Sequence, residues 1–359
     1  MSVLEISLKK FDNNVKIIKK YLDERNIILS PTIKGYHGDL NLVKILEENG
    51  IKEVCSSRIS QLKEVKKHYD MKTFLLRIPA FSELEDISLY VDTILISEKE
   101  TAIKLNEILI KHNKKINVII MQDVGDLREG LMEYDDILSL AKVIENSSNL
   151  NLYGLGVNFN CYGSIGPTIN NINLIVETKK RLEKYFGRKL DILSGGATTS
   201  FKLLFENTLN SEVNELRPGE ILIKKSYPND FCDYSKYLKE IENVFTLKAE
   251  IIELNKKPTY PIGEIAVDGF GKKQNYIDKG IRKRAIVALG KYDVGMGLHV
   301  YPKDENIKVL GGSSDHIILD INDSKIDYKV GDIIEFNLDY ESILFSTASE
   351  DVKKEYIRK

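Results

Sequence analysis

Tryptophan is absent from this chain of 359 residues, and cysteine, histidine and methionine are scarce. The three cysteines, Cys55, Cys161 and Cys232, are odd in number and far apart, which favours reduced thiols over a disulfide framework. The five histidines show no spacing typical of a metal site, so we expect no bound metal.

Long apolar runs and a dominant charge are also missing. No stretch approaches the roughly 20 apolar residues of a membrane span, and the N-terminus lacks the apolar core of a signal peptide. The formal net charge of −2 gives no general attraction for nucleic acid or membranes. We therefore expect a cytoplasmic globular protein with neither kind of partner.

Short apolar segments alternate with amphipathic ones over about the first 225 residues. Most of the apolar segments are continuously hydrophobic, as expected for parallel strands covered on both faces. Eight strand–helix repeats predict an α/β fold, a (β/α)8 barrel of the TIM type. A doubly wound open sheet is the alternative, although the G-x-G-x-x-G that usually marks it is absent after the first strand. The expected strands lie around residues 27–34, 52–56, 73–78, 92–96, 116–122, 151–158, 189–194 and 213–217.

The pattern changes after about residue 230. Short β-rich runs joined by turns such as Asp278-Lys279-Gly280 replace the helical spacing. We therefore predict two domains: a barrel over residues 1–230 and a smaller, mainly β domain over residues 231–359.

Lys34 stands at the carboxyl end of the first expected barrel strand, where reactive residues of barrels gather. Burial there disfavours the ammonium form and lowers the pKa of a lysine, which makes its amine nucleophilic enough to form a Schiff base with an aldehyde. The alternative is a lysine that reaches past the strand end into solvent.

The seventh expected strand ends in Ser194-Gly195-Gly196-Ala197-Thr198-Thr199-Ser200. Glycines there allow close backbone approach, and hydroxyls and free N–H groups at a helix start suit a phosphate. An ordinary glycine-rich turn with a capping hydroxyl is the alternative. A Schiff-base lysine and a phosphate site on one barrel together indicate pyridoxal 5′-phosphate as cofactor.

Seven segments lie in order between residues 31 and 321: PTIKGYHGD, DVGDLREG, GLGVNFNCYG, SGGATTS, LRPGEILI, ALGKYDVG and GGSSDHIILDI. With them the chain resembles the alanine racemase family of pyridoxal-phosphate enzymes (fold type III), and most of all its ornithine racemase branch. The resemblance implies that Lys34 links the cofactor and acts as a catalytic base. It also implies that Arg217 faces the pyridine nitrogen, where an always-charged guanidinium makes the ring a poorer electron sink.

Further roles follow from the same resemblance. The cofactor would be bound by Lys34, Tyr36, Asn158, Ser194, Gly195, Gly196, Thr198, Arg217, Gly219 and Glu220. Arg128, Ser314 and Asp315 would bind the substrate carboxylate. The chain departs from the family at two of these places, since Gly38 stands where a phosphate-binding tyrosine is usual and Asn158 where a histidine stacks on the cofactor.

The second base is left open between two residues. Glu264 aligns loosely with the family's catalytic tyrosine, and Tyr292 corresponds to a residue at the substrate entrance. The family geometry implies a homodimer in which the partner chain supplies this base.

The expected function is a two-base racemisation that interconverts L- and D-amino acids, with ornithine or lysine as substrate. Acidic residues of the second domain, including Glu264, Asp268 and Asp293, could hold a distal ammonium. Alternatives are a racemase for alanine or for many amino acids, a fold-type-III decarboxylase, and a non-enzymatic carrier of the cofactor. The carrier fits least, since such relatives are single barrels.

Overall fold

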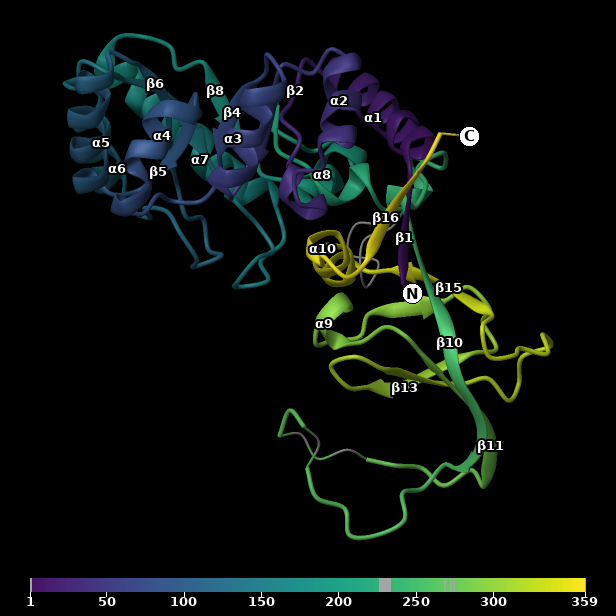
Figure 1. Cartoon of the computed structure of the whole chain (residues 1–359). Helices are drawn as coiled ribbons and strands as arrows, with labels where there is room; N and C mark the ends of the chain where they lie inside the picture. Colours follow the sequence, from purple (N-terminus) through teal and green to yellow (C-terminus); the bar gives the residue numbers. More distant parts are fainter. Residues whose placement is uncertain (1, 226–233, 268, 272, 274, 359) are drawn as a thin grey trace. The chain divides into compact units, whose positions relative to one another are not determined.

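The computed structural model describes residues 2–225, 234–267, 269–271, 273 and 275–358 (Figure 1). The chain forms two compact units, residues 10–242 and residues 1–9 with 243–359. The first residues join the second unit because strand β1 (Val3–Ser7) pairs with two strands of that unit. The boundary predicted at residue 230 lies outside the described residues, and the predicted division stays a prediction.

The first unit contains a parallel sheet of eight strands, ordered β2-β9-β8-β7-β6-β5-β4-β3. A parallel bridge between Thr32 and Cys55 joins the two ends, and the Cys55 N–H donates to the Pro31 carbonyl at 2.8 Å. The fold class predicted from the sequence is confirmed. The strands are β2 (Ile28–Leu29), β3 (Glu53–Ser56), β4 (Lys72–Leu75), β5 (Thr93–Ile96), β6 (Ile116–Met121), β7 (Leu150–Gly156), β8 (Ile192–Ser194) and β9 (Glu215–Leu216).

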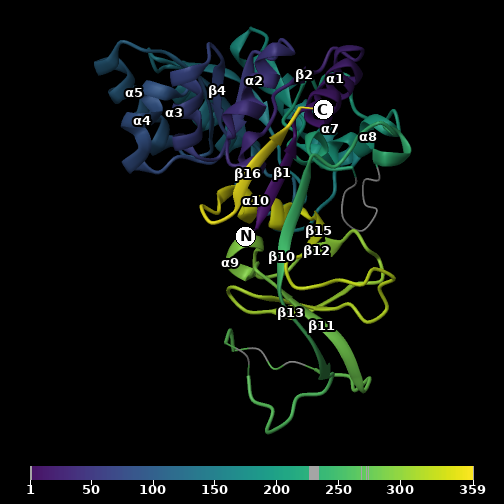
Figure 2. The ribbon, with the colours of Figure 1, turned by 45° about the vertical axis from the view of Figure 1, so that its right-hand side comes forward.

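Helices cover the outside of this sheet (Figures 1 and 2). Each buries one face, as α1 does with Phe11, Val15 and Ile18, and each leaves charged side chains on the other. Side chains cap two of them: Asp39 accepts from backbone N–H groups at the start of α2, and Thr168 does so for α7. The helices are α1 (Leu8–Asp23), α2 (Leu40–Glu48), α3 (Ile59–His68), α4 (Leu84–Tyr90), α5 (Lys99–His112), α6 (Tyr134–Glu145), α7 (Ile169–Phe186) and α8 (Phe201–Phe205).

The interior of the barrel has an apolar and a polar part. Its apolar cluster consists of Cys55, Phe74, Leu95, Ile119, Met121 and Ile192. In the polar part, the Ser30 hydroxyl lies 3.1 Å from Glu53 Oε1 and 2.8 Å from Glu215 Oε1. A hydroxyl has one proton to donate, so Ser30 cannot donate to both carboxyl groups at once. Burial and the neighbouring Glu215 carboxylate raise the pKa of Glu53 to about 7.

We therefore expect the barrel to lose stability between pH 5 and pH 8. The folded chain holds the Glu53 proton more tightly than the unfolded chain does, so this stabilisation is complete below the unfolded pKa and is lost as pH rises through about 7. The free energy of unfolding should fall by roughly 3 kcal/mol as this stabilisation is lost. Glu53→Gln should reduce the drop in the urea midpoint between these two pH values. Glu100→Gln, an exposed change on α5, should keep the wild-type drop, and equal drops in all three proteins would contradict the interpretation.

The second unit is mainly β, as predicted. Its eight-stranded sheet runs β12-β15-β10-β11-β14-β13, and β1 lies between β10 and β16. Two helices, α9 (Lys291–Val294) and α10 (Tyr340–Ala348), complete it. The strands are β10 (Phe245–Pro258), β11 (Ile281–Val287), β12 (Val300–Pro302), β13 (Lys308–Gly312), β14 (Ile317–Asp320), β15 (Ile333–Leu338) and β16 (Lys353–Ile357).

The described residues contain neither a membrane-spanning helix nor a metal-binding cluster of side chains. None of the helices there is both long and apolar enough to cross a membrane. No group of three or more histidine, cysteine, aspartate or glutamate side chains is arranged to hold a metal ion in that part of the chain.

Candidate active site

Lys34 lies just beyond β2, in a single 3₁₀ turn over Ile33–Tyr36. The strand is shorter than predicted, but its ladder continues, because the Ser30 and Thr32 N–H groups donate to carbonyls at and after β9. Lys34 therefore keeps its place at the carboxyl end of the sheet. Its half-buried side chain makes no hydrogen bond or ion pair with any described residue.

The surroundings of Lys34 favour its neutral amine. Burial lowers the pKa of Lys34, and the guanidinium groups of Arg128 and Arg217 lower it further, whereas Cys161 and Glu129 oppose the change. An unpartnered amine with a lowered pKa is the form that attacks a carbonyl carbon.

Arg217 follows β9 and is only 4 % exposed. Its Nε donates to Ser194 Oγ at 2.8 Å, and its Nη2 donates to the carbonyl of Val157. These partners come from the ends of β8 and β7, so three neighbouring strands fix the plane of the guanidinium. Ser194, predicted as a cofactor ligand, acts in this structure as the support of Arg217.

Backbone N–H groups gather at the ends of β8 and β9. The N–H groups of Gly219 and Ile221 both point to Thr198 Oγ1, each at 3.4 Å, which is long for a hydrogen bond. The neighbouring Thr199 hydroxyl is buried without a hydrogen-bond partner in the described part of the chain. Gly196 has φ +102°, and a Cβ there would lie 2.7 Å from Ser200 Oγ. Glycine at 196 thus lets the chain turn closely against Ser200, and the amide and hydroxyl donors beside it suit a phosphate.

The helix dipole expected at this site contributes little. Helix α8 is five residues long and follows a 3₁₀ turn over Thr198–Ser200. The amides of Gly219 and Ile221, in the loop after β9, are the backbone donors that remain beside the hydroxyls of Thr198 and Thr199.

Arg128 lies on the loop after β6. It pairs with the Glu129 carboxylate, and its Nη2 lies 3.1 Å from the Asn158 side-chain oxygen when that amide is oriented to satisfy its neighbours. Burial lowers the pKa of Arg128, but the Glu129 hydrogen bond and nearby Cys161 outweigh this and raise it. Arg128, Asn158 and Cys161 thus come together from the loops after β6 and β7.

Tyr36 and Glu220, both predicted to bind the cofactor, contact other parts of the barrel. The Tyr36 ring is fully buried, packs edge-on against Phe11 at 5.6 Å between ring centres, and has no partner for its hydroxyl among the described residues. The Glu220 carboxylate accepts from Lys224 Nζ at 3.2 Å. Their roles toward a cofactor stay predictions.

The second unit brings three of its predicted residues together. The Tyr292 N–H donates to the Ser314 carbonyl at 3.0 Å, which places Ser314 and Asp315 beside the start of α9. The Tyr292 side chain itself is 68 % exposed. Asp293 accepts from the Gly290 N–H and from Ser349 Oγ, and so it serves the fold. Asp268 lies outside the described residues.

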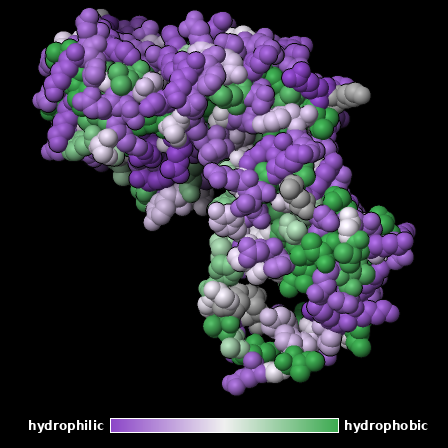
Figure 3. Space-filling model, in the orientation of Figure 1, coloured by the Kyte–Doolittle hydropathy of each residue, from purple (hydrophilic) through white to green (hydrophobic). Residues whose placement is uncertain are grey.

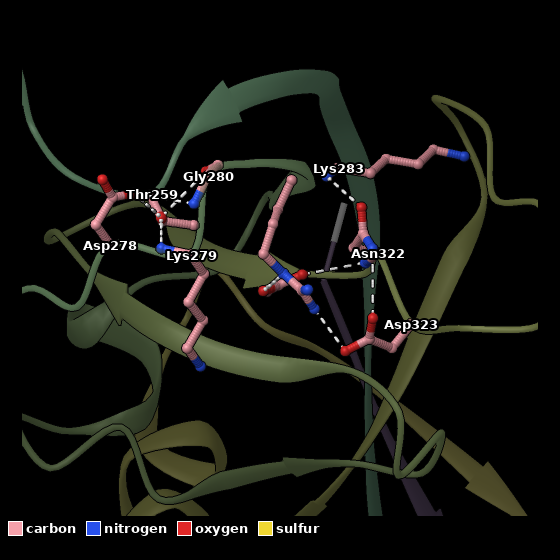
Figure 4. Close-up of polar contacts among 9 residues, drawn as sticks. Thr259, Asp278, Lys279, Gly280, Lys283, Asn322 and Asp323 are labelled. Carbon is pink, nitrogen blue, oxygen red and sulfur yellow. Dashed lines mark hydrogen bonds and ion pairs between the residues drawn. The ribbon is translucent and has the colours of Figure 1, made fainter.

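Glu264 is exposed on the long connection between β10 and β11. The base of this connection is closed, since Thr259 Oγ1 accepts from the Lys279 N–H at 2.6 Å and the Thr259 N–H donates to the Gly280 carbonyl at 3.0 Å (Figure 4). Beside it, Asn322 accepts from the Lys283 N–H at 3.2 Å. We call residues 259–280 the arm.

Comparison with known proteins gives a family for this arrangement. Residues 6–226 match the family described as alanine racemase, N-terminal domain. The chain belongs to the alanine racemase family. Ornithine racemase of Acetoanaerobium sticklandii is 37 % identical over 99 % of both chains, and lysine racemase of Thermotoga maritima is 35 % identical over 98 % of both.

The fold is shared with solved members of this alanine racemase family. Alanine racemase of Clostridium difficile 630 superposes with a TM-score of 0.75 at 22 % identity, over 99 % of this chain and 96 % of that one. With named racemases along nearly its whole length, the chain is an amino-acid racemase. The family resemblance seen in the seven segments is confirmed.

Sequence reasoning missed two side chains of this alanine racemase-family site. Glu129 pairs with Arg128, and Asp126 is buried beneath the same loop. Both stand in the segment DVGDLREG, yet nothing in a run of charged residues indicates which of them is buried.

Proposed function

We propose that this amino-acid racemase uses pyridoxal 5′-phosphate and acts on an amino acid with a distal ammonium group, ornithine ahead of lysine. One observation carries the proposal. The two racemases that match over nearly the whole chain are named for ornithine and lysine, which both carry such a group.

The residues of the barrel fit the cofactor. The unpartnered amine of Lys34 would hold it covalently, the amides of Gly219 and Ile221 with Thr198 would bind its phosphate, and Arg217 would face its ring nitrogen. When bound, the cofactor would supply the electron sink that makes the substrate α-proton acidic.

The protein's own groups would move the proton and orient the substrate. The Lys34 amine, whose pKa is lowered by burial, would take the α-proton from one face. Arg128, held by Glu129 and Asn158, would bind the substrate carboxylate with its guanidinium. Asp315 would lie beside that carboxylate, with Ser314 contributing backbone. A second group would return a proton to the opposite face.

We propose Glu264 as that second group, with Tyr292 next, and a homodimer in which it acts on the partner's barrel. Large apolar side chains support the dimer, because the arm exposes more of them than a monomer usually leaves in water (Figure 3). Ile262 is 92 % exposed and Ile277 is 74 % exposed. Tyr260, Val267, Phe270 and Tyr276 are exposed on the same segment.

A cytoplasmic location is part of the same proposal. Cys55 and Cys161 are both free thiols, which suits a reducing compartment.

The substrate proposal predicts an order of catalytic efficiency. A carboxylate that binds the distal ammonium contributes about 1.5–3 kcal/mol, so kcat/KM for ornithine, then lysine, should exceed that for alanine by roughly 10-fold to 150-fold. Chiral chromatography of each L-amino acid after incubation with enzyme and cofactor measures this. Equal or faster turnover of alanine would contradict the substrate, and release of CO2 without inversion would indicate a decarboxylase.

A further inference from the structure

Two loops border the Lys34 side of the barrel. One, residues 122–133 after β6, carries Arg128, and the other, residues 157–168 after β7, carries Asn158 and Cys161. The neighbouring charges felt by Lys34 include Arg128 from the first loop and Cys161 from the second. Groups from both loops therefore lie near Lys34.

Asp126 joins these loops. Its side chain is charged but only 4 % exposed. Oδ2 accepts from the N–H groups of Cys161 at 3.3 Å and Tyr162 at 3.2 Å, and Oδ1 accepts from Ile165 at 3.4 Å. The Asp126 carbonyl also accepts from the Gly163 N–H at 2.9 Å. Four backbone N–H groups of the loop after β7 thus donate hydrogen bonds to a single residue, Asp126, of the loop after β6.

The fit at this contact is close. A Cβ on Gly163 would lie 2.6 Å from the Asp126 carbonyl oxygen, so only glycine lets the two backbones meet. The turn 160–165 also closes on itself, because the Asn160 N–H donates to the Ile165 carbonyl at 3.0 Å. Asp126 therefore binds a turn that also has a hydrogen bond of its own.

We infer that Asp126 is a positioning residue: its carboxylate fixes the turn 160–165 against the segment that carries Arg128, and so fixes where Arg128 meets the substrate carboxylate. The inference rests on the proposed function of Arg128. Arg128 follows Asp126 by two residues, and its partner Asn158 precedes the turn by two, so both ends of the Arg128–Asn158 contact are anchored by the same carboxylate.

Loss of this carboxylate should release both loops together. Three N–H groups would lose a charged acceptor, and hydrogen bonds to charged groups are the stronger kind. Arg128 would then sample positions away from its binding geometry, which raises the KM of the substrate more than it lowers kcat.

The test compares wild-type holoenzyme with Asp126→Ala and Asp126→Asn. In Asp126→Ala, amide hydrogen exchange of peptides covering 160–165 should become roughly 10-fold to 100-fold faster, and KM for ornithine should rise by a similar factor, with kcat changed by less than about threefold. Asp126→Asn, which keeps one acceptor oxygen, should lie between. If Asp126→Ala does not fold, the comparison of wild type with Asp126→Asn tests the inference instead.

Asp123→Ala is the matched control. Asp123 is a carboxylate of the same loop, but among the described residues its Oδ1 accepts from Gly125 and Leu127, which both belong to that loop. Exchange at 160–165 should stay at the wild-type rate in this variant. Unchanged exchange in both Asp126 variants would overturn the inference, and so would faster exchange with an unchanged KM. If wild-type protein does not racemise ornithine, the proposed function fails instead, and exchange alone still decides whether Asp126 holds the turn.

Discussion

Replacing Lys34 with alanine should lower the rate of racemisation by about three orders of magnitude or more. On the proposed function the amine would have two tasks at one place, covalent attachment of the cofactor and removal of the α-proton. No other described lysine is half-buried at the carboxyl end of the strands with a lowered pKa. The purified variant should also lack the absorbance near the violet edge of the visible spectrum that wild-type holoenzyme shows.

Borohydride provides a readout that does not depend on turnover. Reduction of wild-type holoenzyme should fix the cofactor on the peptide that contains Lys34, and digestion with mass spectrometry locates it. Lys52→Ala, at an exposed position before β3, is the control and should keep activity, absorbance and labelling. A cofactor label on another lysine would refute the assignment.

Mixing two inactive variants should restore activity if the site is shared between chains. Glu264→Gln should lower the rate by roughly 10²-fold to 10⁴-fold, the usual contribution of a general acid or base. Lys34→Ala and Glu264→Gln chains, exchanged at random, give mixed dimers as half of the population, each with one intact site of two. Activity should therefore return to about a quarter of the wild-type value.

Chain exchange has to be shown independently, by native mass spectrometry of differently tagged chains. Exchange without recovery would count against either the shared site or Glu264. Tyr292→Phe, assayed alone and then mixed with Lys34→Ala, separates these two outcomes. If Tyr292 is the second base of a shared site, Tyr292→Phe is inactive alone and its mixture with Lys34→Ala regains activity; if it is not, Tyr292→Phe keeps its own activity.

Much of the barrel could be predicted because its signals are local. Each of the eight strands overlaps its predicted segment. Continuous apolar runs and helical spacing need no knowledge of distant contacts. The seven residues of α4 are too few to show a clear helical repeat. The pairing of β1 could not be predicted because its partner strands lie some 240 and 350 residues away.

The sequence predicts which residues belong to the candidate site better than it predicts how their side chains are arranged. Lys34 and Arg217 stand at strand ends, which the sequence pattern locates. That Ser194 supports Arg217, or that the Tyr36 ring packs against Phe11, depends on side-chain direction and burial. These come from the packing of distant segments, which spacing along the chain does not encode.

The pairing of β1 has a consequence for how the protein is made. Its first strand leaves the ribosome before any partner exists, β10 follows only after the whole barrel, and β16 emerges last. The barrel is complete long before the second unit can close. A chain that ends before Lys353 leaves one edge of β1 unpaired, and unpaired edges invite aggregation and degradation.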